Sequence, residues 1–132
     1  MRYIGGKFRQ SKKLSQHIKC VYDGETYIEP FCGSLSTIKY VKNFIKYGVF
    51  SDVQYQLIKM WTSLKKGWIP PQEISEQLYK EIKNKNDINN PLTAYVGYGL
   101  SFGGKYFGGY ARPGIKNYSR KYDIQLYDSI ML

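Results

Sequence analysis

The chain has 132 residues, 42% of them hydrophobic, and its 20 lysines and arginines against 10 acids give a formal charge of +10. This length supports one hydrophobic core, so we expect a single domain over residues 1–132, and the positive excess is typical of proteins that bind a polyanion such as nucleic acid. Two cysteines without CxxC spacing and a lone His17 argue against a disulfide scaffold and against a zinc site.

The basic composition also has a second explanation. Of the 20 basic residues 16 are lysines, scattered among many Ile, Asn and Tyr, as coding from an AT-rich genome would produce. No apolar run approaches the ~20 residues of a membrane span, and residues 1–6 lack the apolar core of a signal peptide. We therefore expect a cytoplasmic protein with no membrane partner, whose charge reflects either nucleic-acid binding or coding bias.

The first half of the chain alternates helical and extended patterns. Residues 8–21 have apolar positions near helical spacing among basic ones, which predicts an amphipathic helix with a basic outer face. A short strand is expected at 27–31, a helix from Ser36 that ends at Gly48, and a second strand at 49–52.

The second half begins with a predicted helix over 57–64, which completes a β-α-β-α series and predicts a parallel sheet with a right-handed crossover. Further helices are expected around 74–82 and from Pro91, separated by the polar run "NKNDINNP", and a last helix around 122–130. The stretch "SFGGKYFGGYARPG" is too rich in glycine to be regular structure.

Two acidic residues lie where the predicted strands end. Ligands of a parallel sheet bind beyond the carboxyl ends of its strands, and Glu29 and Asp52 occupy these positions, 23 residues apart. An acid after the second strand is suited to accept hydrogen bonds from both hydroxyls of a ribose. The spacing predicts a nucleoside-containing ligand; the alternative is that Glu29 is an edge carboxylate and Gly33 an ordinary turn residue.

The loop after the first strand indicates which nucleoside-containing ligand the chain binds. A dinucleotide would require G-x-G-x-x-G to bring backbone amides onto its pyrophosphate, whereas only Gly33 is present, and no Walker lysine motif occurs. S-adenosylmethionine has ribose and adenine without phosphate. Its sulfonium and ammonium groups suit a carboxylate such as Glu29, and Phe31 is placed to pack on the adenine. An NAD- or nucleotide-dependent enzyme on a similar sheet is the alternative.

Four segments occur in an order that is typical of one enzyme family: "RYIGGK", "YIEPFCGSLS", "SDVQYQLI" and "YVGYGLSFGGKYFGGYARPG". They resemble the aromatic-x-G-G/S-K motif, the E-P-F-x-G loop, the (N/A)-D-I-N-x-x-L-I segment and the start of the target-recognition region in Dam-like, D12-class, phage-type DNA adenine N6-methyltransferases. The resemblance covers essentially the whole chain. It implies an α/β, Rossmann-like class I methyltransferase fold, with 97–116 as the start of the target-recognition region.

The resemblance also implies ligands and contacts. The cofactor is S-adenosylmethionine and the partner is double-stranded DNA, in a bacterial cell or a phage-infected host, with restriction-modification or phage self-protection as the setting. Ser34 and Leu35 replace glycines that are common in the family's loop, which narrows the room for the methionine part. The cofactor contacts carried over by position are Tyr3, Lys7, Glu29, Phe31, Gly33 and Asp52.

The family's catalytic motif is absent from this chain. These enzymes act through D-P-P-Y, and the sole Pro-Pro pair here, Pro70-Pro71, is preceded by Trp68-Ile69 and followed by Gln72. In the family the Asp and a backbone carbonyl accept hydrogen bonds from the adenine amino group, while the Tyr stacks on a flipped base. No catalytic residue is assigned, and we expect cofactor binding without methyl transfer.

The predicted sheet is incomplete. Two strands rarely make a sheet that is stable alone, and the chain ends on the apolar residues 130–132. We therefore expect the N-terminal part of a methyltransferase, split, truncated or proteolysed, whose remaining strands and catalytic loop are missing or supplied by a second chain. The alternative is a catalytically inactive remnant that binds cofactor or DNA for a regulatory purpose.

The glycine-rich segment 101–112 mixes aromatic and basic residues. Glycines allow close approach to a phosphate, aromatic rings stack on bases, and cations neutralise the backbone. The segment predicts a DNA-contacting loop; the alternative is a tyrosine-rich core loop with glycines where side chains would clash. The residues expected to face DNA are Ser101, Lys105, Tyr106 and Arg112.

Overall fold

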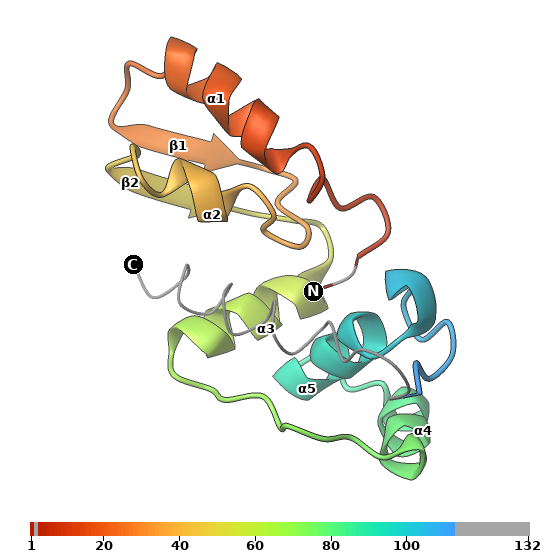
Figure 1. The fold of residues 1–132 in the computed structure, drawn as a ribbon. Helices are drawn as coiled ribbons and strands as arrows, with labels where there is room; N and C mark the ends of the chain where they lie inside the picture. Colours follow the sequence, from red (N-terminus) through yellow and green to blue (C-terminus); the bar gives the residue numbers. More distant parts are fainter. Residues whose placement is uncertain (2, 113–132) are drawn as a thin grey trace.

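The computed structural model describes residue 1 and residues 3–112; the helix expected around 122–130, and the end of the 97–116 segment, lie outside this part of the chain. Figure 1 shows α1, β1, α2 and β2 on one side of α3, with α4 and α5 on the other. The elements are α1 (Ser11–Val21), β1 (Thr26–Glu29), α2 (Ile38–Val41), β2 (Tyr47–Phe50), α3 (Tyr55–Lys65), α4 (Glu76–Lys85), α5 (Pro91–Ala94), the π-helix η1 (Tyr95–Gly99) and the 3₁₀ turn η2 (Phe102–Gly104).

The two strands β1 and β2 form a parallel sheet. Thr26 pairs with Tyr47 and Glu29 with Phe50, so the strands end at the same edge. The two predicted strands and their parallel pairing are confirmed, and the helices around them make a mixed α/β fold. Its assignment to the Rossmann-like class stays a prediction.

The helix predicted from Ser36 to Gly48 is wrong in its length. The α-helix α2 ends at Val41, and Phe44 N–H then bonds to the Val41 carbonyl in a tighter turn. Gly48 lies inside β2, where a Cβ would come within 2.5 Å of the Phe50 ring. Position 48 is therefore glycine because an aromatic ring packs over its backbone, and not because it ends a helix.

The helix predicted at 8–21 forms as α1, but its buried side differs from the apolar pattern. Ser11 and Ser15 are buried, whereas Phe8 and Leu14 are 52% and 37% exposed. The Ser11 hydroxyl donates to the Lys7 carbonyl at 2.7 Å, which satisfies it in the protein interior. The buried positions of α1 are thus small serines, which an apolar periodicity does not reveal, and the helix lies against α2.

The hydrophobic core is centred on α3. Its buried residues Leu57, Met60 and Trp61 belong to the core cluster, and the helix packs against α5. The Trp61 indole N–H donates to the Gly33 carbonyl at 2.9 Å. The helix at the centre of the molecule thus fixes the loop that follows the first strand.

The helix from Pro91 is confirmed and changes character after one turn. Asn90 caps it by accepting a hydrogen bond from Leu92 N–H at 2.9 Å, and it then widens into the π-helix η1. A Cβ at Gly97 would lie 2.5 Å from the Tyr106 ring. Gly97 therefore makes room for the aromatic side chains that follow, and π-turns of this kind are frequent at functional sites.

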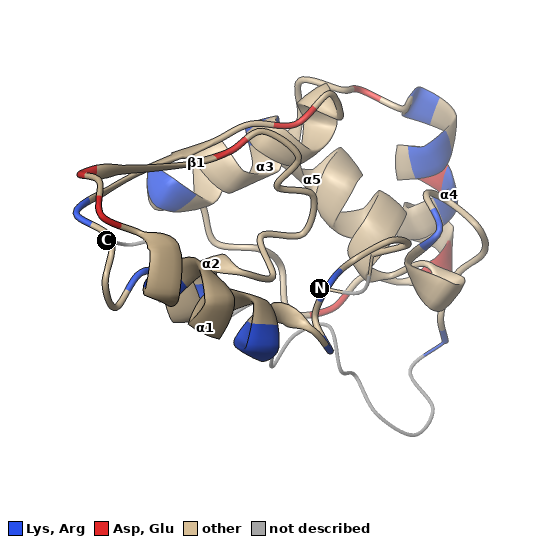
Figure 2. Cartoon of the chain, turned by 90° about the horizontal axis from the view of Figure 1, so that it is seen from above, with Lys and Arg blue, Asp and Glu red and all other residues tan. Residues whose placement is uncertain are grey.

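The basic residues are spread over the surface. Figure 2 shows lysine and arginine on both α1 and α4, and these helices lie far apart in both views. No single helix in the described part of the chain accounts for the charge. None of the helices there is long and apolar enough to cross a membrane.

Candidate functional site: a cavity at the carboxyl ends of the strands

A cavity of about 200 Å³ opens where β1 and β2 end. Three segments that are distant in the sequence form its walls: the N-terminal turn 3–7, residues within 29–37, and Asp52 just after β2. Glu29 and Asp52 therefore lie on the same side of the molecule, as parallel pairing of the strands predicts. All six residues predicted to contact the cofactor line this cavity: Tyr3, Lys7, Glu29, Phe31, Gly33 and Asp52.

Glycines allow the N-terminal turn to pack on the loop after β1. Gly5 has a φ of +80°, and Gly6 N–H donates to the Tyr3 carbonyl at 3.0 Å, which closes the turn. At Gly33, with a φ of +47°, a Cβ would lie 3.0 Å from Cε1 of Tyr3. The Tyr3 ring can form a wall of the cavity because position 33 has no side chain.

Asp52 links the ends of the two strands. Its Oδ2 accepts a hydrogen bond from Gly33 N–H at 2.8 Å, and its Oδ1 accepts one from Gln54 N–H at 2.9 Å. Beside it, Cys32 N–H donates to the Ser51 carbonyl at 2.9 Å and extends the pairing beyond the strands. Each carboxylate oxygen keeps a second acceptor site. The half-buried Asp52 is thus a fixed acceptor at the wall of the cavity.

Glu29 has no ion-pair partner among the described residues. Its Oε2 accepts hydrogen bonds from the Tyr27 hydroxyl at 3.2 Å and from the Thr37 hydroxyl. Nothing in the described part of the chain donates to its Oε1. A half-buried carboxylate in this state is best stabilised by a cationic group of a ligand.

The cavity contains neither an activated thiol nor a metal site among the described residues. Burial, and the nearby Asp52 and Glu29, raise the pKa of Cys32 to about 12, so its thiol is neutral near pH 7 and a poor nucleophile. No cluster of three or more potential metal ligands occurs in residues 1 and 3–112. The side chains of the cavity are suited to bind a ligand rather than to attack one.

Two of the predicted contacts lie at the rim. Phe31 is 76% exposed and presents its ring to solvent beside the opening. Lys7 is also exposed, at the end of the N-terminal turn. An exposed aromatic ring next to a polar cavity is suited to cover a flat ring of a bound ligand.

Leu35 occupies a conformation that glycine favours. Its φ is +52°, while its side chain is 3% exposed and belongs to the core. Leu35 N–H donates to the Cys32 carbonyl at 2.8 Å, which closes the turn of the loop. The loop therefore keeps a left-handed residue at one of the two positions where leucine and serine replace the family's glycines.

The predicted DNA-contacting segment folds back on η1. Phe102 N–H donates to the Gly109 carbonyl at 2.8 Å, so the segment forms a hairpin-like loop. Ser101 is 1% exposed, and its hydroxyl lies 2.7 Å from that of Tyr79. The prediction that Ser101 faces DNA does not agree with this position, because a buried hydroxyl with a partner inside the protein cannot reach a phosphate.

The other three residues of that prediction differ in exposure. The Tyr106 ring is half-buried, 4.7 Å from the ring of Tyr98, and its hydroxyl donates to Asn86 at 2.6 Å. Lys105 is exposed, and the side chain of Arg112 is 81% exposed although its Nε lies 3.4 Å from Oε2 of Glu76 in a surface ion pair. The segment thus combines a packed aromatic part, which the core-loop alternative describes, with accessible cations.

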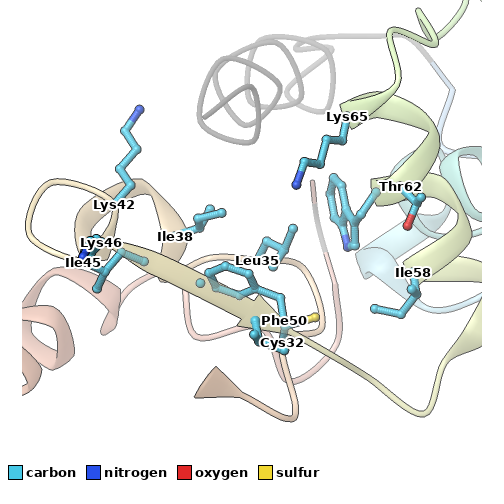
Figure 3. A pocket seen from close by; sticks show the side chains of 13 residues that line it. Cys32, Leu35, Ile38, Lys42, Ile45, Lys46, Phe50, Ile58, Thr62 and Lys65 are labelled. Carbon is cyan, nitrogen blue, oxygen red and sulfur yellow. The ribbon is translucent and has the colours of Figure 1, made fainter. Parts of the chain in front are cut away.

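A second cavity, of about 430 Å³, lies between α2, β2 and α3 (Figure 3). Its lining is largely apolar, and Lys42, Lys46 and Lys65 lie at its edge. No carboxylate lines it, so it offers neither a partner for a cation nor a paired acceptor for ribose hydroxyls. This larger cavity does not have the chemistry that the sequence predicts.

Sequence reasoning missed several residues of the first cavity. The most informative is Thr37, which is buried and hydrogen-bonded to Glu29. A signal existed, because small polar residues at the start of a helix after a parallel strand are placed at the ligand edge of the sheet. The missed lining residues are Ile4, Gly5, Gly6, Cys32, Ser34, Ser36 and Thr37.

Comparison with known families is consistent with this geometry. A family model described as D12 class N6 adenine-specific DNA methyltransferase matches residues 3–98. The match spans more than half of the 132 residues and includes every wall of the cavity. No curated protein and no solved structure matches the chain.

Proposed function

Because the chain belongs to the D12 class of N6 adenine-specific DNA methyltransferases, we propose that the cavity at the ends of β1 and β2 binds S-adenosylmethionine. The family acts on adenine in DNA. The observation that carries the proposal is the convergence of three distant segments on one cavity, which contains a fixed acceptor and a carboxylate without an ion-pair partner among the described residues.

The residues present fit the chemistry of this cofactor. Oε1 of Glu29 accepts no hydrogen bond from residues 1 and 3–112, so a cationic group such as the ammonium or the sulfonium can contact it. Asp52 has acceptor capacity left for ribose hydroxyls. The cavity volume of about 200 Å³ is below the ~300–1,000 Å³ of a typical ligand pocket. We therefore place the amino-acid and ribose parts inside, with the adenine at the rim beside Phe31.

The cofactor supplies a methyl group on a positively charged sulfur. The residues described here bind and orient it, with Tyr3 packed over Gly33 and Asp52 bonded to the Gly33 N–H in the same wall. No D-P-P-Y sequence occurs in the 132 residues, so we assign them to cofactor binding within an N-terminal methyltransferase domain. Nothing in the described residues argues for a second chain, and none is proposed.

The partner of the family is DNA, and we place its contact at the accessible side of segment 97–112. Lys105 and Arg112 are exposed cations, and Phe102 is an exposed ring, 73% accessible, at the start of η2. The half-buried Tyr106 supports this loop and exposes only part of its ring. Cations would neutralise phosphates, and the exposed ring is able to stack on a base.

Isothermal titration with S-adenosylmethionine tests the proposal. The wild-type protein is expected to bind, and Glu29→Gln, which keeps the shape and removes the charge, is expected to weaken binding by about tenfold, or ~1.4 kcal/mol. Glu81→Gln on α4 is the matched control, because Glu81 is exposed and lies outside the cavity. Displacement by NAD, or an absence of binding, would contradict the proposal.

A second candidate is a catalytically inactive module that holds cofactor or DNA. The absence of D-P-P-Y from these residues favours it. An assay with tritiated S-adenosylmethionine and adenine-containing duplex DNA separates the two: transfer of label by the 132-residue chain would show that the residues present are sufficient for catalysis.

A further inference from the structure

We propose that Thr37 and Tyr27 are positioning residues, which hold Glu29 so that its Oε1 faces the cationic part of the cofactor. This inference rests on the function proposed above. Both hydroxyls donate to the same carboxylate oxygen, Oε2. The second oxygen is the one that no described residue engages.

The two donors reach Glu29 from different elements. Tyr27 precedes it by two residues on β1, so both side chains lie on the same face of the strand. Thr37 comes from the start of α2 and is 2% exposed. A carboxylate held from the strand and from the helix has little rotational freedom left. Its free oxygen therefore has a defined direction relative to the cavity that Thr37 and Glu29 both line.

The Thr37 hydroxyl bonds to Glu29 and does not cap its own helix, α2. It occupies the N-cap position of α2, where a threonine side chain usually accepts a hydrogen bond from the backbone of the first turn, but no such bond forms here. Its hydroxyl is directed to Glu29 instead. Thr37 has a helical φ of −81° and ψ of −31°, so its hydroxyl is not placed to cap α2 and is available to Glu29.

The aromatic neighbour of Tyr27 supports the same geometry. The Tyr27 ring lies 5.9 Å from the ring of Phe50, in a tilted arrangement across the two strands. This packing limits where the hydroxyl can lie. The donor is thus fixed by the sheet itself, and removing the hydroxyl alone leaves the ring in place.

A positioning role has a consequence that a structural role does not. Without the hydroxyls, the Glu29 carboxylate can rotate and its interaction with a ligand cation weakens, whereas the adenine and ribose contacts remain. The contrast is measured with two ligands: S-adenosylmethionine, and methylthioadenosine, which keeps adenine, ribose and sulfur but carries neither the sulfonium nor the ammonium charge.

The variants are Thr37→Val and Tyr27→Phe. Each is compared with a control variant that loses the same hydroxyl group at a position outside the cavity. Thr93→Val removes a buried threonine hydroxyl on α5, and Tyr55→Phe removes a tyrosine hydroxyl on α3; neither residue lines the cavity. Thr37→Ser restores the donor without the methyl group. All variants are first compared by urea denaturation, so that binding is measured on folded protein.

We expect Thr37→Val to weaken binding of S-adenosylmethionine by about threefold, which is less than the effect of Glu29→Gln because the charge remains and only its orientation is lost. Tyr27→Phe is expected to weaken it by about twofold, because its bond is longer. Methylthioadenosine should bind all variants alike, and Thr37→Ser should recover most of the affinity. Equal weakening of both ligands, or none in either variant while Glu29→Gln loses affinity, would overturn the positioning role and leave the proposed function standing. Absence of binding by the wild-type protein would overturn both.

Discussion

Asp52→Ala is expected to lower the free energy of unfolding even without a ligand. The carboxylate accepts hydrogen bonds from two backbone N–H groups, one local, from Gln54, and one from Gly33, 19 residues away. A hydrogen bond to a charged group contributes ~1.5–3 kcal/mol when well shielded. Since Asp52 is only half-buried and water replaces part of each bond, we expect a loss of about 2–3 kcal/mol. This is a large fraction of the ~5–15 kcal/mol of a typical domain.

A matched variant isolates the long-range bond. Asp87 Oδ1 accepts from Asn89 N–H at 3.0 Å, two residues on, which repeats the local bond between Asp52 and Gln54. Asp87→Ala is therefore expected to cost about 0.5–1 kcal/mol, as one hydrogen bond does. Urea denaturation with unchanged m values compares the two. Equal losses for Asp52→Ala and Asp87→Ala would refute the view that Asp52 ties the loop of Gly33 to the second strand.

The same variant then tests the cofactor site. A ligand that binds only the folded state raises stability by ~2.7 kcal/mol at one hundred times its dissociation constant. We expect S-adenosylmethionine to protect the wild-type protein and Asp87→Ala in this way, and to protect Asp52→Ala much less. Similar protection of all three would show that Asp52 holds the loop but does not contact the ligand.

Three further substitutions and one labelling experiment test other parts of the structure. Gly33→Ala should cost ~1–2 kcal/mol in urea denaturation, because the position has a φ of +47° and its Cβ would press on the neighbouring ring; an unchanged midpoint would contradict this. Iodoacetamide at pH 8 should label the exposed Cys20 and spare the buried Cys32, as mass spectrometry would show, and equal labelling of both thiols would contradict the burial. Burial raises the pKa of Cys32 from 9.0 to about 12. Its neutral thiol therefore stabilises the fold fully below pH 9, and this contribution is lost as the pH rises towards 12. Lys105→Ala should weaken DNA binding and make its salt dependence shallower, by ~0.9 in the logarithmic slope, whereas Ser101→Ala should lower stability alone.

The sequence predicted the ligand edge of the sheet because both signals are local. Glu29 and Asp52 each follow a short extended run, and parallel strands bring their carboxyl ends together without further information. Gly33 was also predictable, since a loop that reverses direction within a few residues commonly needs a positive φ. These residues are placed by the backbone, so their positions follow from spacing.

Other features depend on neighbours that no local pattern reveals. Gly48 was predicted to end a helix, but its role is set by the Phe50 ring that covers it. Ser101 was predicted to face DNA as part of the glycine-rich segment with aromatic and basic residues, but its hydroxyl lies 2.7 Å from that of Tyr79 in the interior. The position of Thr37 at the ligand edge could be inferred from the sequence, but its bond to Glu29 could not, because the two residues lie on different elements. In each case the identity of the residue is explained by a tertiary contact.

Leu35 shows how such a contact can preserve a site whose sequence departs from the family pattern. A residue with a side chain at a φ of +52° costs ~1–2 kcal/mol relative to glycine, whereas burial of a leucine side chain contributes ~1.5–3 kcal/mol. Since Leu35 is 3% exposed, its packing into the core offsets the strain and holds the left-handed turn. The backbone of the loop, including the Gly33 N–H that binds Asp52, can therefore follow the path that glycine would permit. In this chain the left-handed turn is thus stabilised by the packing of a leucine side chain, at a position where glycine is common in the family.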